Sequence, residues 1–390
     1  MMKFLITNAH SSNSGDLAIQ ATLIRQLHKI SGDAEITVLC SYPEFSRKNI
    51  GGDTSFKNYI WPIFDGTPSF QEFVQSAFML LDIFLSALVY RVSGKRIFSE
   101  KNSPFGDFLD SDIVIGAGGG YLSHDYGFIR PYADYLLAKF LGKKLILYNH
   151  SIGPFGGSIN RAVSGFVLRK ADLIIVREKR SKKNLEELGI KNARLSADLA
   201  FAFTGFKPAN KRKNTVVICP RKSIYRCRNK EDNYFMLLAS LSKKLISSGK
   251  KVIILPTTPE DIKLYESLKK VIPEEVEYIN TVHPPDKIAE LLSESEFLVS
   301  SRIHPIILGS LSSTPFFALG WEYKLDEISK MICEDCHANA YDANDKTTDL
   351  ILQNIKRRKK IGSRNLLLLR KQAESSAEIM NESLVRWGYI

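Results

Sequence analysis

An arginine and a histidine stand two residues apart where an apolar run ends, in the stretch SSRIHPIILG. Arg302 and His304 follow Phe297–Ser300, which reads as a buried strand, and open a segment that reads as a buried helix. Ligands of open α/β sheets bind at the carboxyl ends of strands, near helix starts. A fixed charge beside a titratable imidazole there predicts an anionic substrate whose reaction moves a proton. A surface arginine and a histidine bound to a backbone carbonyl would give the same pattern.

Glycines end another strand-like run, in the stretch DIVIGAGGG. Gly118, Gly119 and Gly120 have no side chain and allow the backbone to approach a ligand closely. The stretch is not a G-x-G-x-x-G followed by the usual acidic residue, and no Walker lysine follows it. The pattern therefore predicts a ligand contact and disfavours a nucleotide site.

Three further polar residues follow predicted strands. Asp16, after the turn-forming Gly15, either caps the helix expected over 16–30 or binds sugar hydroxyls. Asn149 lies in the polar cluster YNHSIGPF, at another strand end. Arg221 follows the run TVVICP and places a second guanidinium in the C-terminal half of the chain.

The composition is that of a soluble globular protein with an excess of positive charge. The 390 residues are 44% hydrophobic and 25% charged, and 54 Lys and Arg against 42 Asp and Glu give a formal charge of +12. Such a balance favours anionic partners, among them phosphorylated small molecules, acidic glycans and an anionic membrane face. No interleaved basic and aromatic module is present, so we expect no nucleic-acid partner.

Five scattered cysteines disfavour a disulfide framework and favour a reducing compartment. CEDCH, residues 333–337, matches the haem-attachment pattern, but the start MMKFLITNAH reads as a buried strand and not as a signal peptide. A zinc site would need a second ligand pair, which the sequence does not offer. We therefore expect a cytoplasmic protein with no metal and no cofactor.

The most hydrophobic segment is Phe73–Val92. Asp82 at its centre disfavours a membrane-spanning helix. The segment is either a core helix or a surface helix that rests on a membrane or binds a lipid tail, with the basic flank Arg91–Arg96 beside it. The sequence thus leaves open a peripheral contact with the inner membrane face.

Short apolar runs alternate with helix-length amphipathic segments along most of the chain. This alternation predicts an α/β fold of two Rossmann-like domains with parallel sheets, facing a central cleft. We expect an N-terminal domain over residues 1–205, a C-terminal domain over 206–344 and a charged helical tail over 345–390. A polar, basic joint, GFKPANKRKN, separates the two domains.

The order of these patterns resembles the polysaccharide pyruvyl transferase family. The resemblance runs from about residue 3 to residue 333 and rests on the GD-started first helix, GAGGG, NHSIGP, ADLIIVREKRS, LSADLAF, SRIHPIILG and a lysine after the last strand. It implies a GT-B-like fold, phosphoenolpyruvate as donor, and a glycan or lipid-linked saccharide as acceptor. The implied product is a pyruvate ketal in a cell-surface polysaccharide.

The resemblance also implies roles for residues. His304 would act as general acid and base, and Arg302, Arg221 and Lys324 would hold phosphoenolpyruvate. By position, the acceptor side would comprise Asp16, Gly118, Gly119, Gly120 and Asn149. Asp198 matches a recurrent family aspartate, although a structural cap explains it equally well.

Two other functions stay open at this point. A GT-B glycosyltransferase that uses a nucleotide sugar would share the fold and would need an acidic residue near a helix start, for which Glu322 is the candidate. A non-catalytic scaffold would use the apolar segment and the basic tail, but would not need Arg221, Arg302 and His304. The sequence indicates neither the acceptor sugar nor the oligomeric state.

Overall fold

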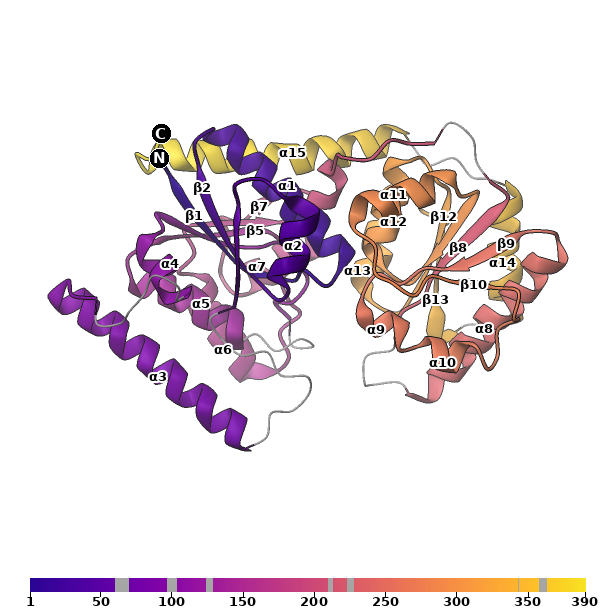
Figure 1. Cartoon of the computed structure of the whole chain (residues 1–390), viewed down its shortest axis with the longest axis horizontal. Coiled ribbons are helices and arrows are strands. Elements are labelled where there is room, and N and C mark those ends of the chain that lie inside the picture. The colour runs from indigo at the N-terminus through magenta and orange to yellow at the C-terminus, as the bar shows by residue number, and fades with distance from the viewer. Residues whose placement is uncertain are drawn as a thin grey trace. The chain divides into compact units, whose positions relative to one another are not determined.

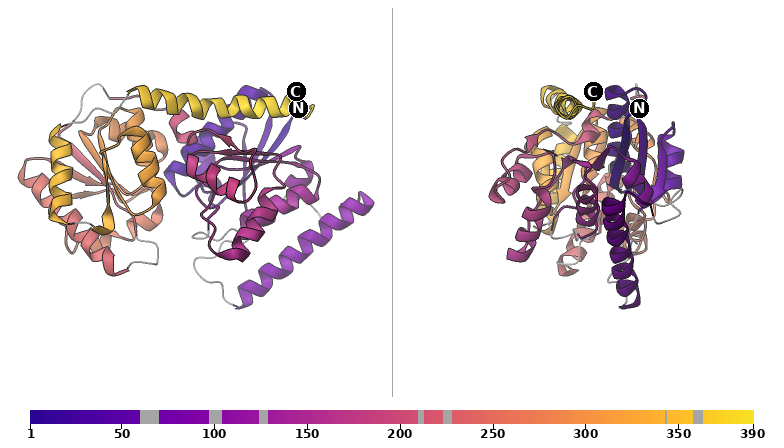
Figure 2. Two further views of the ribbon diagram at one scale, coloured as in Figure 1. Left: turned by 180° about the vertical axis from the view of Figure 1, so that it is seen from behind. Right: turned by 90° about the vertical axis from the view of Figure 1, so that its left-hand side faces the viewer.

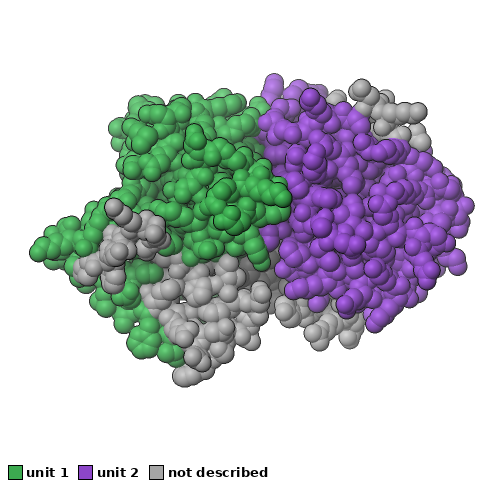
Figure 3. Space-filling view, viewed as in Figure 1, with its two compact units in different colours: residues 1–11, 19–199, 372–390 green, residues 12–18, 200–371 purple. Residues whose placement is uncertain are grey.

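The structure is a computed structural model of the chain, and it describes residues 1–59, 70–96, 104–123, 129–209, 213–222, 228–342, 344–357 and 363–390. The chain forms two compact units, which Figure 3 colours separately. Unit 1 comprises residues 1–11, 19–199 and 372–390, and unit 2 comprises residues 12–18 and 200–371. The segment expected as a tail, 345–390, is thus divided between the two units.

Unit 1 is built on a sheet of seven parallel strands in the order β3-β2-β1-β4-β5-β6-β7 (Figure 1). The strands are β1 (Lys3–Ala9), β2 (Glu35–Cys40), β3 (Ser55–Asn58), β4 (Ile113–Gly116), β5 (Lys144–His150), β6 (Leu173–Val176) and β7 (Arg194–Leu195). Every residue of β4 and β6 is buried, because helices cover both faces of a parallel sheet. This explains the continuous apolar runs IVIG and LIIV.

The helices of unit 1 connect these strands. They are α1 (Ser14–Ile30), whose first turn belongs to unit 2, α2 (Pro43–Ile50), α3 (Phe70–Ser93), α4 (Pro104–Asp110), α5 (Ile129–Phe140), α6 (Gly157–Leu168), α7 (Lys179–Glu187), the short helix η1 (Leu199–Ala202), and the C-terminal part of α15 (Ser363–Arg386). One face of the sheet, represented by Leu5, Val114 and Leu147, shares a core with residues of α3 to α7. Figure 2 shows this layer of helices from two further directions.

Unit 2 has a second parallel sheet, of six strands in the order β10-β9-β8-β11-β12-β13. The strands are β8 (Thr215–Cys219), β9 (Lys251–Ile254), β10 (Glu277–Tyr278), β11 (Phe297–Ser300), β12 (Phe316–Gly320) and β13 (His337–Asn339). The helices are α8 (Arg228–Ser247), α9 (Pro259–Ile262), α10 (Tyr265–Leu268), α11 (Pro285–Glu294), α12 (Ile303–Leu311), α13 (Tyr323–Ile332), η2 (Ala340–Asp342) and α14 (Asp345–Arg357). The carboxyl ends of β9, β8, β11 and β12 therefore meet at one edge of this sheet.

The predicted α/β class with two parallel-sheet domains is confirmed. Two strands were not predicted, β3 and β13, because each is short and neither is a run of apolar residues. The connection between β9 and β10 contains two short helices, α9 and α10. The part of the joint at 210–212 lies outside the described residues.

A local disulfide joins Cys333 and Cys336 at the end of α13. It links residues three apart, so it is not a framework between distant segments, but the expectation of reduced cysteines is wrong for this pair. Cys40 and Cys219 are free and buried, and Cys227 lies outside the described residues. Within the described ranges we find no group of side chains suited to a metal ion and no helix that is long and apolar enough to cross a bilayer.

Candidate functional site

Four neighbouring strands of unit 2 carry charged side chains just beyond their carboxyl ends. Arg221 follows β8, Asp261 follows β9, Arg302 follows β11, and Glu322 follows β12. His304 and Lys324 each stand two residues further along, on α12 and α13. The fold thus brings all four residues expected to serve the donor, Arg221, Arg302, His304 and Lys324, to one edge of one sheet.

Arg221 is held by Glu322 in a bidentate ion pair. Its two terminal nitrogens lie 2.7 and 2.9 Å from the two carboxylate oxygens, and both side chains are largely buried. Burial raises the pKa of Glu322, but the charge and hydrogen bonds of Arg221, with Lys324 and Arg302 nearby, outweigh burial and hold the pKa below its ordinary value. Glu322 is therefore a carboxylate that fixes the orientation of the Arg221 guanidinium.

Arg302 is held by Asp261, a residue that the sequence reasoning missed, through one terminal nitrogen of the guanidinium. The Asp261 side chain is 0% exposed and forms an ion pair with the Arg302 guanidinium, which also donates to Thr258 Oγ1 at 3.1 Å. The other Asp261 oxygen accepts from the backbone nitrogens of Thr257 and Thr258, at 3.0 and 3.1 Å. Arg302 Nε is buried and makes no hydrogen bond to the described residues, so one donor of a fixed guanidinium remains for a ligand.

His304 lies in the first turn of α12. The turn from β11 into this helix is fixed by Ser300, whose hydroxyl donates to the carbonyl of Arg302 at 2.7 Å and accepts from the Arg302 nitrogen at 3.0 Å. Pro305 follows in the same turn and is buried. A proline is tolerated there because the N–H groups of the first turn have no partner within the helix. The half-buried imidazole thus lies at a helix start, where the first backbone N–H groups have no partner within the helix.

Gly15, in the part of α1 that belongs to unit 2, lies directly against the His304 ring. A Cβ atom added at Gly15 would stand 1.9 Å from both Cγ and Nδ1 of the imidazole. Only a glycine leaves space for the ring in this position. Asp16, the next residue, lies in the same helical turn and is half-buried.

Lys324 is nearly buried at the start of α13, and its ammonium lies 5.8 Å from the centre of the Tyr323 ring. A cavity of about 410 Å³ opens beside it. Residues that line this cavity include Gly320, Trp321, Glu322, Tyr323, Asp326 and His337. Glu322 joins this cavity to the charged strand ends, whereas Arg221, Asp261, Arg302, His304 and Lys324 are not among its lining residues.

The side chains that follow β8, β9, β11 and β12 carry one more positive than negative charge. Three cations, Arg221, Arg302 and Lys324, face two carboxylates, Asp261 and Glu322. Helix starts at these strand ends add partial positive charge, and the half-buried Asp16 next to Gly15 adds one negative charge on the side of the imidazole. The site can accordingly bind a small anion and has an imidazole that can move a proton.

The residues expected on the acceptor side lie in unit 1, apart from Asp16. Gly118 meets a packing demand, because a Cβ there would lie 2.8 Å from the backbone oxygen of Tyr148. The buried Asn149 amide nitrogen is within 2.6 Å of the Ala197 oxygen and 2.8 Å of Ser376 Oγ on α15. An acceptor-binding role for Gly118, Gly119, Gly120 and Asn149 stays a prediction.

Asp198 takes part in a buried network of unit 1. Its carboxylate accepts from Arg177 at 2.5 Å, and Arg177 Nε donates to Ser151 Oγ at 2.7 Å. Both charged side chains are almost fully buried. The sequence reasoning named Asp198 but missed Arg177, although the arginine stands in the quoted stretch ADLIIVREKRS.

Residues 13–323 match the polysaccharide pyruvyl transferase family. The chain belongs to this family. A curated relative, the amylovoran biosynthesis protein AmsJ of Erwinia amylovora, is 23% identical over 369 residues, which cover 85% of this chain and 86% of AmsJ. The resemblance inferred from the residue patterns is thereby confirmed, and with it a transferase of polysaccharide biosynthesis.

Solved structures share the fold of this pyruvyl transferase at low sequence identity. The UDP-GlcNAc 2-epimerase of Methanocaldococcus jannaschii is 15% identical with a TM-score of 0.60, covering 98% of this chain and 100% of its own. S. aureus MnaA, solved with UDP, is 12% identical with a TM-score of 0.61, covering 100% and 98%. Acinetobacter baumannii MurG is 9% identical with a TM-score of 0.51, covering 99% and 100%. These likenesses confirm the expected GT-B-like fold.

Proposed function

We propose that this pyruvyl transferase takes its pyruvyl group from phosphoenolpyruvate and forms a pyruvate ketal on a sugar. One observation carries the proposal. Two guanidinium groups, each fixed by a carboxylate, stand with a nearly buried lysine at the strand ends that also present His304. Phosphoenolpyruvate has a phosphate and a carboxylate, and fixed guanidinium groups suit bidentate contact with either.

The roles of the cations follow from their surroundings. Arg302 has a buried Nε available and lies at the start of α12, so it binds one oxyanion together with the backbone donors of that helix. Arg221 and Lys324 bind the other, and Glu322 keeps the Arg221 fork in place. We assign them to the donor as a group and do not divide phosphate from carboxylate.

His304 moves the protons that ketal formation requires. One sugar hydroxyl adds to the carbon that bears the phosphate, while a proton is added to the methylene carbon to give a methyl group. The second hydroxyl then attacks the same carbon, and the C–O bond to phosphate breaks. Of the two hydroxyl protons, one ends on the methyl carbon and the other on the released phosphate. The imidazole gives and takes these protons beside cations that stabilise the phosphate as it leaves.

The acceptor is a sugar of a cell-surface polysaccharide or of its lipid-linked precursor. Family membership supports a polysaccharide acceptor, and Asp16, next to the His304-contacting Gly15, is the residue we propose to contact a sugar hydroxyl. A carboxylate that accepts from a hydroxyl is a common sugar contact. We do not assign the sugar or its linkage.

A thermal shift assay tests the donor. Phosphoenolpyruvate at about 100 times its dissociation constant should stabilise the fold by about 2.7 kcal/mol, whereas uridine diphosphate should have no effect. Arg302→Met should abolish the stabilisation by phosphoenolpyruvate, and Lys263→Met, an exposed cation of the same unit, should retain it. Stabilisation by uridine diphosphate alone would support the glycosyltransferase, for which Glu322 would be the ribose ligand.

Phosphate release in the presence of candidate lipid-linked saccharides tests the reaction, with the product identified by its mass. His304→Gln should retain the thermal shift with phosphoenolpyruvate and lower phosphate release by about 10²- to 10⁴-fold. Undiminished release by this variant would refute the role of the imidazole even if the donor is right.

A further inference from the structure

The second half of helix α3, whose side chains are described, is attached to unit 1 by one face. Ile83 and Ala87 are buried in the unit 1 core, and Phe84 packs edge-on against Phe140 of α5, with 6.3 Å between the ring centres. Near its end, Arg91 lies over the same Phe140 ring and donates to the Phe140 carbonyl. In Figure 1 the helix extends along the side of the unit.

The opposite face of α3 is apolar and exposed. Its large side chains follow a spacing of three and four residues, which is one stripe of a helix. They are Phe78, Leu81, Leu85, Leu88 and Val92, with Val89 beside them. Among the residues of α3 whose exposure is described, Asp82 is the one exposed acidic residue. A stripe that alternates by three and four residues and faces water is unusual for a soluble monomer.

A second helix of the same layer repeats this feature. On α6, Ile159, Val163 and Phe166 are exposed at the spacing of one stripe, while Val167 and Leu168 are buried. α5 packs against both α3 and α6. The two stripes together are called the apolar surface here, and their nine side chains are between 36% and 79% exposed.

Exposed apolar side chains are concentrated on α3 and α6 relative to the rest of the described surface. Twenty large apolar side chains are exposed among the described residues, and nine of them lie on α3 and α6. These helices have only 24 and 12 residues. Isolated exposed apolar residues need no explanation, but a cluster of this size marks a contact surface.

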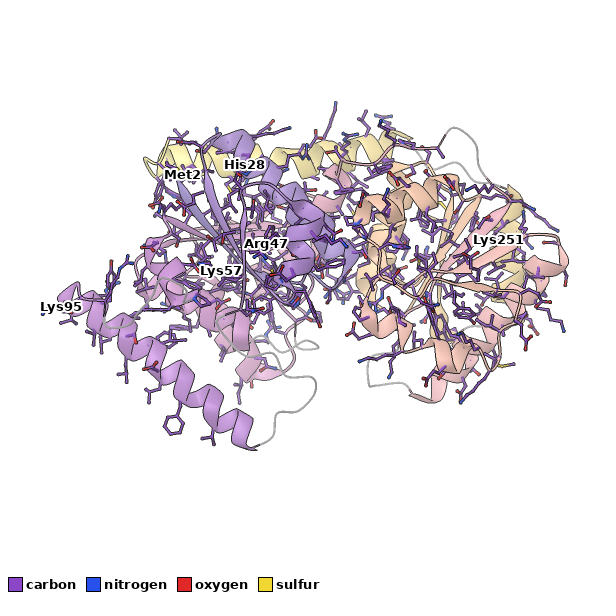
Figure 4. All side chains as sticks on the ribbon, in the orientation of Figure 1. Met2, His28, Arg47, Lys57, Lys95 and Lys251 are labelled. Carbon is purple, nitrogen blue, oxygen red and sulfur yellow. A yellow bond between two sulfur atoms is a disulfide. The ribbon has the colours of Figure 1, made fainter. Side chains whose placement is uncertain are left out.

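Exposed cations accompany both stripes. They are Arg91, Lys95 and Arg96 at the end of α3, and Arg161, Arg169 and Lys170 on and after α6; these six are called the basic rim. The Lys170 ammonium lies 4.4 Å from the centre of the Phe166 ring, so this cation is in contact with an exposed apolar side chain of α6. Asp110 and Glu187 neutralise Arg96 and Arg161 in part. Figure 4 shows Lys95 at the tip of α3, beyond the last exposed turn.

This charge pattern decides between a second copy of the chain and a lipid surface. A two-fold contact through α3 and α6 would place identical cations of two basic rims near one another, which costs free energy. An anionic bilayer supplies phosphates to the rim and an apolar interior to the stripes. Basic side chains that flank exposed apolar helices are typical of such interfacial binding.

We propose that α3 and α6 bind the surface of an anionic lipid bilayer. The apolar surface enters the boundary between headgroups and acyl chains, and the basic rim contacts lipid phosphates. This inference does not rest on the donor chemistry of unit 2, because every residue it uses lies in unit 1. It adds a location at which a lipid-linked acceptor would be available to the transferase.

Vesicle flotation with the full chain tests the proposal. The chain should float with vesicles of phosphatidylcholine and phosphatidylglycerol and stay in solution with phosphatidylcholine alone. Leu85→Ser, Val92→Ser and Phe166→Ser together should lower the partition coefficient at least about tenfold, since each removes an apolar side chain from the bilayer. A matched control, Met236→Ser with Leu367→Ser and Leu368→Ser, replaces equally exposed apolar residues on α8 and α15 and should bind as the wild type does.

A second variant, Lys95→Gln with Lys170→Gln, tests the contribution of the basic rim. Loss of these two cations should weaken binding by about fivefold each, and added salt should remove the difference. Lys263→Gln with Lys269→Gln, exposed cations of unit 2, is the control and should bind normally. Equal flotation of the apolar variant and its control, or equal flotation with neutral vesicles, would overturn the proposal. Sedimentation velocity without lipid tests the alternative partner, a second copy of the chain. If the wild type and the control variant are dimers and the apolar variant is a monomer, the partner is a second copy and the proposal is wrong.

Discussion

Arg221 and Glu322 form a bidentate ion pair between the carboxyl ends of β8 and β12, across the intervening strand β11. The pair therefore spans the strand end that carries Arg302 and His304. Glu322 orients the guanidinium and at the same time lowers the net positive charge of the site. The arginine is pre-organised for an anion but is not an uncompensated buried charge, which would be costly.

A double-mutant cycle on this pair should show strong coupling. Arg221→Met leaves the Glu322 carboxylate in a largely buried place without its partner, so we expect a loss of about 2 kcal/mol in the free energy of unfolding, less than for a fully buried pair. Arg221→Met with Glu322→Gln should recover about half of this loss, because the stranded charge is gone. Urea unfolding at neutral pH measures both.

The pH dependence of the pair has a definite sign. The folded-state pKa of Glu322 is below its ordinary value of 4.5, so its contribution to stability is present above that pH and is lost as the pH falls through the folded pKa. The cost of Arg221→Met should consequently shrink under acidic conditions. A cost that is the same at neutral and acidic pH would contradict the ion pair.

Asp261→Asn should impair the donor site through Arg302. An amide has one oxygen, so it cannot both accept from Thr257 and Thr258 and pair with the guanidinium, and it lacks the charge. We expect KM for phosphoenolpyruvate to rise about tenfold with a smaller change in kcat. Glu266→Gln, an exposed acid of the same unit, should leave both unchanged.

A positioning role for Asp261 can be separated from a general loss of stability. If Asp261 acts through Arg302, then Arg302→Met combined with Asp261→Asn should raise KM no further than Arg302→Met alone. Additive effects on KM would mean that Asp261 supports the site in some other way.

Gly15→Ala should disable His304 although it changes neither charge nor catalytic group. The added methyl would lie 1.9 Å from the imidazole, and the ring would have to move. A displacement of about 1 Å in a catalytic group can cost about 10²-fold in rate. Gly32→Ala is the matched control, because a Cβ at Gly32 meets nothing within 4 Å. Full activity in both variants would show that the ring need not occupy this place.

The residue patterns predicted the sheets well because both are buried on two faces, so strands such as β6 and β11 are unbroken apolar runs. The rule that ligands bind at strand ends then pointed to Arg221 and Arg302, and the resemblance to the family added Lys324. The partner of Arg302 could not be found in this way. Asp261 stands 41 positions earlier and reaches it across an intervening strand, so only the order of strands in the sheet brings the two together.

Local patterns also do not reveal the structural contacts that a side chain makes. Asn149 was expected to bind the acceptor from its place at a strand end, yet its amide is buried against Ser196, Ala197 and the α15 residue Ser376. Sequence spacing does not reveal that a helix more than two hundred residues later covers this strand end. The apolar segment 73–92 is another example, since α3 is a core helix on one face and a surface helix on the other.

His150, a buried imidazole of unit 1, should make the stability of this unit depend on pH. The imidazole is fully buried at the end of β5, with Nε2 3.1 Å from the Gly116 oxygen. The pKa of His150 is lowered from 6.5 to about 3, chiefly by burial and also by the Arg177 charge, and the contacts with the Gly116 and Gly119 backbone oppose this lowering only in part. Below pH 6.5 the unfolded chain therefore binds a proton that the folded chain does not, so stability falls as the pH falls, by about 1.4 kcal/mol per pH unit.

His150→Gln removes this proton, and its free energy of unfolding, measured in urea from about pH 8 to about pH 4, should fall less steeply than that of the wild type. The two curves should run parallel above pH 6.5, and curves that stay parallel below it would show that His150 takes up its proton in the folded chain.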